Sequence, residues 1–385
     1  MSETHFDLGI VGGGPVGCAL ALMLARLSPE PSRVALWQSD AENRYGLRGE
    51  QDTRVIAINE GSRTLLRDLD AWPDDACPIL TIHVSQKGRL GRTLITNEEF
   101  KVPALGYVVR YASLQAGLLQ AVQNAGISLF QDKILDLAEM PDGCRVESSR
   151  GHVSLAIAVR ADGMNHQREP DHYRQVALLG QARVSRPKPG WAFERFTRCG
   201  PLAVLPHPAG DGSQSIVWCS SPERATALMQ LAPGQLGVAM TEAFGDRLGS
   251  FDVVSDFQAY PLFQSLDPAP VQGRLVNIGN AAQTLHPVAG QGMNLGLRDA
   301  ATLAHCLRDW IAYPHRDPKR PLDIYERLRR GDRQSTVKLT DFMSRAFTTG
   351  WPVVEHAAGI ALLALDTIEP LRAPLARHLM QGLRQ

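Results

Sequence analysis

The chain has 385 residues, which is too long for one simple core and suits two closely joined domains. Its hydrophobic content of 44% and charged content of 21% are typical of a globular protein that dissolves in water. The net charge is zero, so no basic face is indicated and a nucleic acid is excluded as the main partner.

The first predicted elements are a buried strand at 6–11, a glycine-rich turn and a helix rich in Ala and Leu. A second strand at 33–38 completes a βαβ unit. The turn has the spacing Gly-x-Gly-x-x-Gly, which permits a tight turn, close approach of a pyrophosphate and close packing of helix on strand. This context predicts a dinucleotide site, and a turn kept only for packing is the alternative. The expected contacts are Gly12, Gly14, Pro15 and Gly17.

The end of the second strand carries Gln38, at the position where an acidic residue usually accepts the ribose hydroxyls. An amide oxygen accepts a hydrogen bond more weakly than a carboxylate does. Asp40 is a second candidate acceptor. We therefore expect Gln38 to contact the cofactor, with weaker binding of its adenosine half.

Two helices are predicted next, at 60–72 and 111–126, followed by a strand at 152–159 that leads into Asp162 and Gly163. An Asp-Gly pair after a strand is a common turn without any ligand. Together with the first glycine turn, it also suits a second contact near the pyrophosphate and ribose. Asp162 is therefore a candidate cofactor contact, with an ordinary turn as the alternative.

From 172 to 265 the sequence changes to short apolar segments between turns rich in Pro and Gly. The segments at 175–184, 200–206 and 214–220 predict an antiparallel sheet that forms a second, inserted domain. The expected division is a nucleotide-binding domain at 1–75, 105–170 and 270–345, a substrate domain at 76–104 and 171–269, and a helical C-terminal segment at 346–385.

A strand at 274–279 then enters a polar stretch with four glycines, IGNAAQTLHPVAGQGMNLGLRDA, at 278–300. Open α/β sheets place ligands at such strand ends, and bare N–H groups at a helix start stabilise negative charge. A reduced flavin carries negative charge at the N1–C2=O end of its ring. The stretch therefore predicts a flavin contact, with a ligand-free helix start as the alternative. The expected contacts are Gly279, Asn280, Pro287, Gly290, Gln291, Gly292, Met293 and Asn294.

Three residues are expected to line the reactive site without an assigned chemical role: Pro287, His286 and Arg54. A histidine beside a proline is more often structural than a proton shuttle. An arginine such as Arg54 is more often solvated or paired with an acid, unless the fold brings it to the flavin. The other histidines lack metal-ligand spacing, so no metal is predicted.

The stretches 12–17, 161–163 and 279–299 together resemble the flavin-dependent aromatic hydroxylases related to p-hydroxybenzoate hydroxylase. More narrowly, they resemble the ubiquinone-biosynthesis branch of that family, and the likeness covers almost the whole chain. Asn280 and Gln283 stand where most members have Asp and His. The stretch that contains these two residues, and the stretch 81–91, resemble the members that hydroxylate 2-polyprenyl-6-methoxyphenol. Further similar segments, in matching order, are 54–72, 105–119, 192–206, 216–220 and 260–262. Other departures from the family are Gln38, Arg160 and His166.

The resemblance implies an α/β fold: a Rossmann-like FAD-binding domain with an inserted antiparallel-sheet substrate domain and a helical C-terminus. It implies that FAD is held by the three motifs together with Gln38 and Arg54, and that Asn280 bonds the ribityl hydroxyls without a charge. It also implies hydroxylation of a polyprenylated phenol to the 1,4-benzoquinol, with NAD(P)H and O2, through a flavin C4a-hydroperoxide.

A polyprenylated phenol is insoluble in water, so the resemblance implies a substrate delivered from a membrane or a carrier, and partners among other quinone-biosynthesis proteins. The N-terminus lacks the positive region of a signal peptide, and no apolar run reaches the roughly 18 to 20 residues that span a bilayer. We expect a cytoplasmic protein, with peripheral contact at the inner face of the membrane left open.

The C-terminal stretch 359–379 suits either an amphipathic helix that faces a membrane or partner, or a helix that caps the flavin domain. Two functional alternatives also stay open. One is a related flavin hydroxylase that acts on a small soluble aromatic compound. The other is a non-catalytic scaffold subunit with the same fold.

Overall fold

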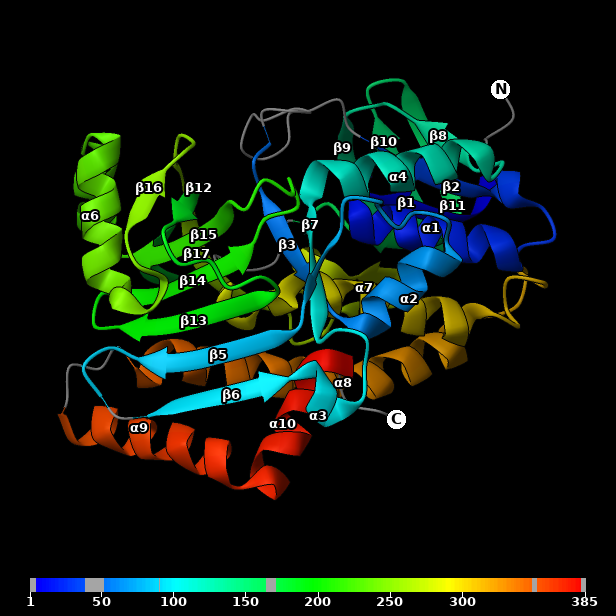
Figure 1. The fold of residues 1–385 in the computed structure, drawn as a ribbon. Coiled ribbons are helices and arrows are strands. Elements are labelled where there is room, and N and C mark those ends of the chain that lie inside the picture. Colours follow the sequence, from blue (N-terminus) through cyan, green and yellow to red (C-terminus); the bar gives the residue numbers. More distant parts are fainter. Residues whose placement is uncertain (1–4, 39–51, 90, 164–170, 348–351, 382–385) are drawn as a thin grey trace.

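The computed structural model describes residues 5–38, 52–89, 91–163, 171–347 and 352–381. Within these residues, an eight-stranded sheet and a nine-stranded sheet form the two main bodies, and a three-stranded sheet lies between them (Figure 1). The C-terminal helices run along one side of both bodies (Figure 1). This arrangement confirms the predicted α/β class with a second, largely antiparallel sheet.

The first sheet is parallel at its centre, in the order β18-β19-β11-β1-β2-β8, and β10 and β9 extend it from β11. Strand β1 is buried on both faces from Phe6 onward, which explains why its residues after Asp7 are all apolar or glycine. The strands are β1 (His5–Val11), β2 (Val34–Trp37), β8 (Ser128–Phe130), β9 (Ile134–Met140), β10 (Gly143–Ser148), β11 (Gly151–Arg160), β18 (Val271–Gln272) and β19 (Leu275–Asn277).

Three helices pack against the first sheet and share one apolar core with it. This core includes Leu8 and Ile10 of β1, Leu20 of α1 and Leu114 of α4, all fully buried. The helices are α1 (Pro15–Leu27), α4 (Tyr111–Asn124) and α7 (Gln291–Leu307). Of the short 3-10 helices, η1 (Pro31–Arg33) precedes β2, η4 (Gly279–Ala281) follows β19, and η5 (Val288–Gly290) directly precedes α7. The βαβ unit predicted from the first glycine turn is therefore confirmed.

The second sheet follows the order β20-β17-β12-β15-β14-β13-β5-β6, with β16 beside β12, and all its pairs except β13 with β5 are antiparallel. Its strands are β5 (Thr81–Gln86), β6 (Arg92–Thr96), β12 (Asp171–Val184), β13 (Trp191–Thr197), β14 (Gly200–Pro206), β15 (Gln214–Ser220), β16 (Phe251–Val253), β17 (Gln258–Leu266) and β20 (Gln283–Thr284). The associated helices are α3 (Asn97–Phe100), α5 (Pro222–Met229), α6 (Pro233–Phe244) and η3 (Asp246–Leu248).

Helices α5 and α6 cover one face of the second sheet, where Trp218, Met240 and Phe244 form its core. The strands come from the ranges expected for the substrate domain, except that β20 lies in the polar stretch 278–300. The domain boundaries themselves stay a prediction.

The small sheet consists of β3 (Val55–Ile58), β7 (Gly106–Arg110) and β4 (Cys77–Ile79). Helix α2 (Glu60–Asp68) follows β3 and is shorter than the predicted 60–72. Asp70 lies in the left-handed region, with φ of 57°, so the chain leaves the helix there.

The C-terminal part consists of α8 (Lys319–Ala346), α9 (Pro352–Thr367) and α10 (Glu369–Gln381). Helix α9 lies on β6, where the Leu94 amide donates to Asp366 Oδ1 at 2.8 Å, whereas α10 contacts α2. The stretch 359–379 thus spans two helices, so the prediction of a single helix is wrong. Helix α9 packs on the second sheet, and α10 packs beside α2. Among the described residues, none of the helices combines the length and hydrophobicity that crossing a bilayer requires.

Candidate functional site

The three glycine-containing motifs lie at one edge of the first sheet. Strands β1, β11 and β19 are parallel neighbours, and Val11, Arg160 and Asn277 are partners in their register. The residues after these three strand ends are therefore adjacent, as expected at the carboxyl edge of an open α/β sheet. Segments more than 260 residues apart in sequence meet because of this strand order.

Two glycines of the first turn are required by close backbone contacts. Gly12 has φ of 125°, and a Cβ there would overlap the Ala161 carbonyl of the second motif. A Cβ at Gly17 would overlap the Gly12 carbonyl oxygen, where α1 packs on the turn. Side chains at these positions would separate the turn from the helix and from the neighbouring strand.

Helix α7 begins without a side-chain cap. Its N-cap residue Gly290 lies in the left-handed region, with φ of 59° and ψ of 33°. A Cβ at Gly292 would meet no atom within 4 Å, so the first turn of the helix faces open space. The first N–H groups of an α-helix have no partner within the helix, and they carry its positive dipole end.

Helices α1 and α7 approach closely, which brings their N-termini into one site. A Cβ at Gly296 would lie 2.7 Å from Val16 Cγ2 and 3.2 Å from the Gly279 Cα. Helix α1 also lacks a side-chain cap, with Gly14 as its N-cap and Pro15 in its first turn. Two positive helix ends therefore open into the same cavity.

This cavity has a volume of about 1070 Å³. It brings together every predicted site residue except Gly17, whose role in the structure is packing against Gly12. The predicted residues that line it are Gly12, Gly14, Pro15, Gln38, Arg54, Asp162, Gly279, Asn280, His286, Pro287, Gly290, Gln291, Gly292, Met293 and Asn294. Their contacts with a cofactor stay a prediction. Asp40 and His166 lie outside the described residues.

Arg54 is both paired with an acid and part of the cavity wall. Its Nε and Nη2 donate to Asp52 at 2.8 and 2.6 Å, and its guanidinium lies 4.0 Å from the centre of the Tyr111 ring. Burial acts to lower the pKa of Arg54, but the bonds to Asp52 outweigh it and raise the pKa. The two roles that the sequence left open are therefore compatible.

His286 is fully buried and has the contacts of a structural histidine. Its Nδ1 accepts a hydrogen bond from the Val288 amide at 3.3 Å, so Nε2 carries the proton and donates to Gln175 Oε1 at 2.9 Å. Burial lowers the pKa of His286 to about 4, which keeps the ring neutral at physiological pH. The ring holds the Pro287 turn in place, and this geometry favours the structural alternative over a proton shuttle.

The Asn294 side chain ties α7 to the small sheet. Its Nδ2 donates to the carbonyls of Ala57 and Gly290, both at 2.9 Å, and its Oδ1 accepts from the Asn59 amide at 2.9 Å. Since these bonds engage both ends of the amide, the side chain fixes the start of α7. A cofactor would meet the backbone of this turn rather than the Asn294 amide.

Gln283, which stands where most of the family has His, belongs to a buried network beneath the site. Its Nε2 donates to Asp299 Oδ2 and its Oε1 accepts from Arg333 Nε, both at 2.5 Å. Asp299 also accepts from the Gly279 amide at 3.1 Å and from Arg329 at 2.8 Å. A neutral amide can bridge an acid and a base in this way, so the replacement keeps the Gly279 turn anchored.

Helix α4 contributes residues to the site that were not predicted from the sequence. Gln115 Nε2 donates to the Gly13 carbonyl at 2.7 Å, and Gln115 and Tyr111 both line the cavity. The Gln115 Oε1 is buried without a partner among the described residues. In the sequence, a single polar residue beside Leu114 of an amphipathic helix carries no signal of this role.

The cavity continues past the motifs between the second sheet and the C-terminal helices. This part is lined mainly by apolar side chains, among them Ile82, Val84, Ile95, Leu179, Ala192, Ala203, Leu205, Val217, Met343 and Ala376. Within the described lining from the second sheet, Glu194 on β13 is the one residue with a carboxylate. Neither feature was predicted residue by residue, because both depend on which face of each strand meets the cavity.

FAD fits the residues of this cavity. The cavity has open space beside Gly292, two helix N-termini without side-chain caps, and a Gln115 Oε1 that lacks a partner among the described residues. A ligand with phosphates and an electron-rich ring would occupy these features. The turn at Gly12 to Val16 would hold the pyrophosphate, Gln38 the ribose, and the turn after Gly290 the flavin edge.

Comparison with known proteins agrees with this geometry. A family model described as "FAD binding domain" matches residues 177–340. The ubiquinone hydroxylase UbiL of Rhodospirillum rubrum is 32% identical, over 98% of this chain and 90% of that protein. The 3-demethoxyubiquinol 3-hydroxylase of Escherichia coli is 28% identical, over 98% of this chain and 99% of that protein.

Solved structures support the same fold at lower sequence identity. PqsL of Pseudomonas aeruginosa, with 2-aminobenzoylacetate, has a TM-score of 0.74 at 19% identity and covers 93% of this chain and 100% of its own. The p-nitrophenol 4-monooxygenase PnpA of Pseudomonas putida has a TM-score of 0.73 at 16% identity and covers both chains fully. The chain therefore belongs to the FAD-dependent aromatic hydroxylases of ubiquinone biosynthesis, and it is a flavoprotein monooxygenase.

Proposed function

We propose that this enzyme hydroxylates 2-polyprenyl-6-methoxyphenol to the corresponding 1,4-benzoquinol, using NAD(P)H and O2. The observation that carries the proposal is the apolar continuation of the 1070 Å³ cavity beyond the predicted flavin contacts. Pockets that enclose drug-sized ligands are about 300–1000 Å³. A cofactor site that also accepts a ring and part of an isoprenoid chain needs this additional apolar volume.

The apolar continuation suits a prenyl chain better than a small soluble aromatic compound. Its walls come from alternate residues of the second sheet, such as Ala203 and Leu205, and from Met343 and Ala376 of the C-terminal helices. Burying apolar surface is favourable by about 25 cal/mol per Å², so each isoprene unit inside the cavity adds to affinity. A small soluble phenol would leave this surface exposed to water.

Bound FAD would supply the activation of O2 with electrons from NAD(P)H. The open N-terminus of α7 would stabilise negative charge on the flavin edge beside Gly292. Glu194 would accept a hydrogen bond from the phenol hydroxyl, which raises the electron density of the ring carbon para to it. The apolar walls would exclude water, which protects the reactive oxygen from loss as hydrogen peroxide.

The first test is deletion of the gene in its host, followed by identification of the quinone precursor that accumulates. Accumulation of 2-polyprenyl-6-methoxyphenol, and its removal by the restored gene, is the expected result. A demethoxylated precursor that already carries the para hydroxyl would instead assign a different ring carbon. An unchanged quinone pool would refute a role in ubiquinone synthesis.

The second test separates the prenyl chain from the ring. Ala203→Trp fills the apolar continuation, so we expect kcat/KM for a long-chain phenol to fall at least tenfold while a phenol with one short prenyl unit is affected less than threefold. Ala227→Trp, on the exposed surface of α5, is the matched control. Equal losses for both substrates would contradict the assigned path of the chain.

We also propose that the substrate is taken from a membrane or a carrier, and that the enzyme works beside other quinone-biosynthesis proteins. Exposed apolar side chains on the C-terminal helices support contact with such a surface, since Phe342 is 65%, Ile360 68% and Leu371 54% exposed. Sedimentation of the FAD-loaded protein with lipid vesicles, before and after Ile360→Asn and Leu371→Asn, tests this contact. The two substitutions are expected to reduce the bound fraction, and an unchanged fraction would refute it.

A further inference from the structure

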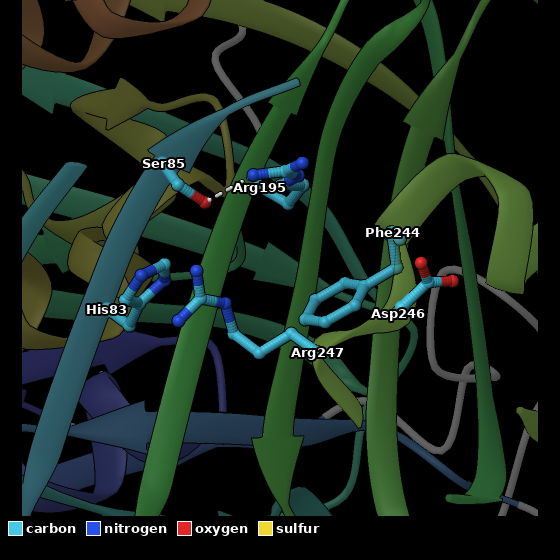
Figure 2. Close-up of a pocket in the computed structure, with 7 residues that line it drawn as sticks. His83, Ser85, Arg195, Phe244, Asp246 and Arg247 are labelled. Atoms are coloured by element: carbon cyan, nitrogen blue, oxygen red, sulfur yellow. Dashed lines mark hydrogen bonds between the residues drawn. The ribbon is translucent and has the colours of Figure 1, made fainter. Parts of the chain in front are cut away.

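A second, smaller cavity of about 150 Å³ lies on the other face of the second sheet, under η3 and the end of α6 (Figure 2). Side chains alternate between the two faces of β5, so Ile82 and Val84 line the large cavity whereas His83 and Ser85 line the small one. Arg195 of β13 faces the small cavity, as its bond to Ser85 shows. The sheet therefore separates this cavity from the flavin site.

The described residues that line the small cavity carry more positive than negative charge. Arg195 Nη1 donates to Ser85 Oγ at 3.0 Å, and its Nε is buried without a partner among the described residues. Burial, followed by the charge of Arg247, lowers the pKa of Arg195. The one carboxylate in the lining, Asp246, lies beyond Phe244 from His83 in Figure 2. In the described part of the chain, neither arginine forms an ion pair.

His83 is a buried residue whose ring lacks hydrogen bonds within the described part of the chain. It is only 1% exposed, and neither ring nitrogen has a partner among the described residues. Burial and the nearby charges of Arg247, Arg92 and Arg195 lower the pKa of the ring to about 4, so the ring is neutral at physiological pH. A neutral imidazole offers one N–H donor. Figure 2 shows the Arg247 guanidinium beside this ring.

We propose that this cavity binds an oxyanion of the phosphate type, held by His83, Ser85, Arg195 and Arg247. Guanidinium groups match the geometry of phosphate oxygens and are the usual ligands of such anions. The volume of about 150 Å³ is below the roughly 300 Å³ of the smallest pockets that enclose a drug-sized ligand, so one phosphate group fits and a whole nucleotide does not.

The bound anion would complete the bonds of His83 and Arg195 and join β5 and β13 to the η3 turn. The same chemistry is offered by free phosphate, by a phosphate ester and by the headgroup of an acidic phospholipid. The second sheet lies between this site and the large cavity, so the two cavities are separate. The inference therefore stands independently of the substrate proposed above.

The experiment is thermal unfolding of the FAD-loaded protein in saturating inorganic phosphate, against sodium chloride of equal ionic strength. Phosphate is expected to raise Tm by about 2–5 °C through preferential binding to the folded state. Arg247→Gln, at an exposed position of η3, should abolish this rise, whereas Arg145→Gln, at an exposed position of β10, should leave it unchanged. Equal Tm values in the two salts, or an undiminished rise in Arg247→Gln, would overturn the proposal.

A second measurement identifies the source of the phosphate. Wild-type protein and both variants are sedimented with vesicles of phosphatidylcholine, with and without phosphatidylglycerol. If Arg247→Gln loses both the phosphate response and binding to the acidic vesicles, the ligand is a lipid headgroup. If only the phosphate response is lost, the ligand is a free phosphate or a soluble ester. Ser85→Ala, which removes a donor without changing charge, should weaken phosphate binding about threefold to tenfold in either case.

Discussion

The two ends of the large cavity are lined by different chemical groups. At one end, the motifs at Gly12, Asp162 and Gly279 present backbone groups and helix N-termini. At the other end, alternate side chains of the second sheet, such as Ala203 and Leu205, present apolar surface. A backbone site tolerates few substitutions because glycine is needed at close contacts, whereas a side-chain site can be reshaped one residue at a time.

The largest effect is expected at the backbone end. Gly12→Ala places a Cβ on the Ala161 carbonyl at a φ of 125°, so we expect loss of bound FAD and a decrease of about 3 kcal/mol in the free energy of unfolding. Flavin absorbance of the purified protein and urea unfolding measure the two effects. Gly234→Ala, where a Cβ meets no atom within 4 Å, is the control. Full flavin content in Gly12→Ala would show that the turn can relax.

At the side-chain end, Glu194→Gln should change chemistry without changing cofactor binding. We expect kcat to fall about 100-fold, the size of a typical acid–base contribution, with unchanged flavin content. Steady-state hydroxylation and flavin absorbance provide the two measurements, and Glu147→Gln on the exposed side of β10 is the control. A kcat within threefold of wild type would remove Glu194 from the mechanism.

His286 connects the two ends and gives a prediction about pH. Its pKa of about 4 lies below the ordinary value of 6.5, so between these values the unfolded chain binds a proton that the folded protein does not. The free energy of unfolding should therefore decrease as pH falls from 6.5 to 4, by about 3 kcal/mol for this residue.

Urea unfolding of the FAD-free protein across this pH range checks the prediction. His286→Gln should reduce the slope by up to about 1.4 kcal/mol per pH unit, while His83 keeps its own contribution because its pKa is also lowered to about 4. The kcat of the wild type should show no titration of His286 between pH 6 and 8. An identical slope in the variant would mean that the buried ring does not stay neutral.

The smallest effect is expected where the sequence departs from the usual ribose contact. Gln38→Glu restores a carboxylate at the end of β2, beside the turn at Gly13. A hydrogen bond to a charged acceptor is about 1 kcal/mol stronger than one to an amide, so the Kd for FAD should fall about fivefold. Titration of FAD-free protein, monitored by flavin fluorescence, measures this change, and weaker binding would place the ribose elsewhere.

Most of the backbone end could be predicted from the sequence, but little of the side-chain end. Gly12, Asp162 and Gly279 were found because each follows a strand and precedes a turn or helix, which is a local pattern. Gln115 and Glu194 were not found, because their role depends on a helix and a strand distant in sequence meeting the same cavity. Arg54 stayed undecided for the same reason.

The sequence by itself determined the βαβ unit, the uncapped glycine-rich helix starts and the apolar strands, since these follow from local backbone geometry and hydrophobic periodicity. The tertiary structure decided the rest. The parallel order β19-β11-β1-β2 brought the motifs to one edge, and the pairing of β5 with β13 assigned alternate residues to opposite cavities. Strand order and face depend on pairing over long sequence separations, and no local pattern records that pairing.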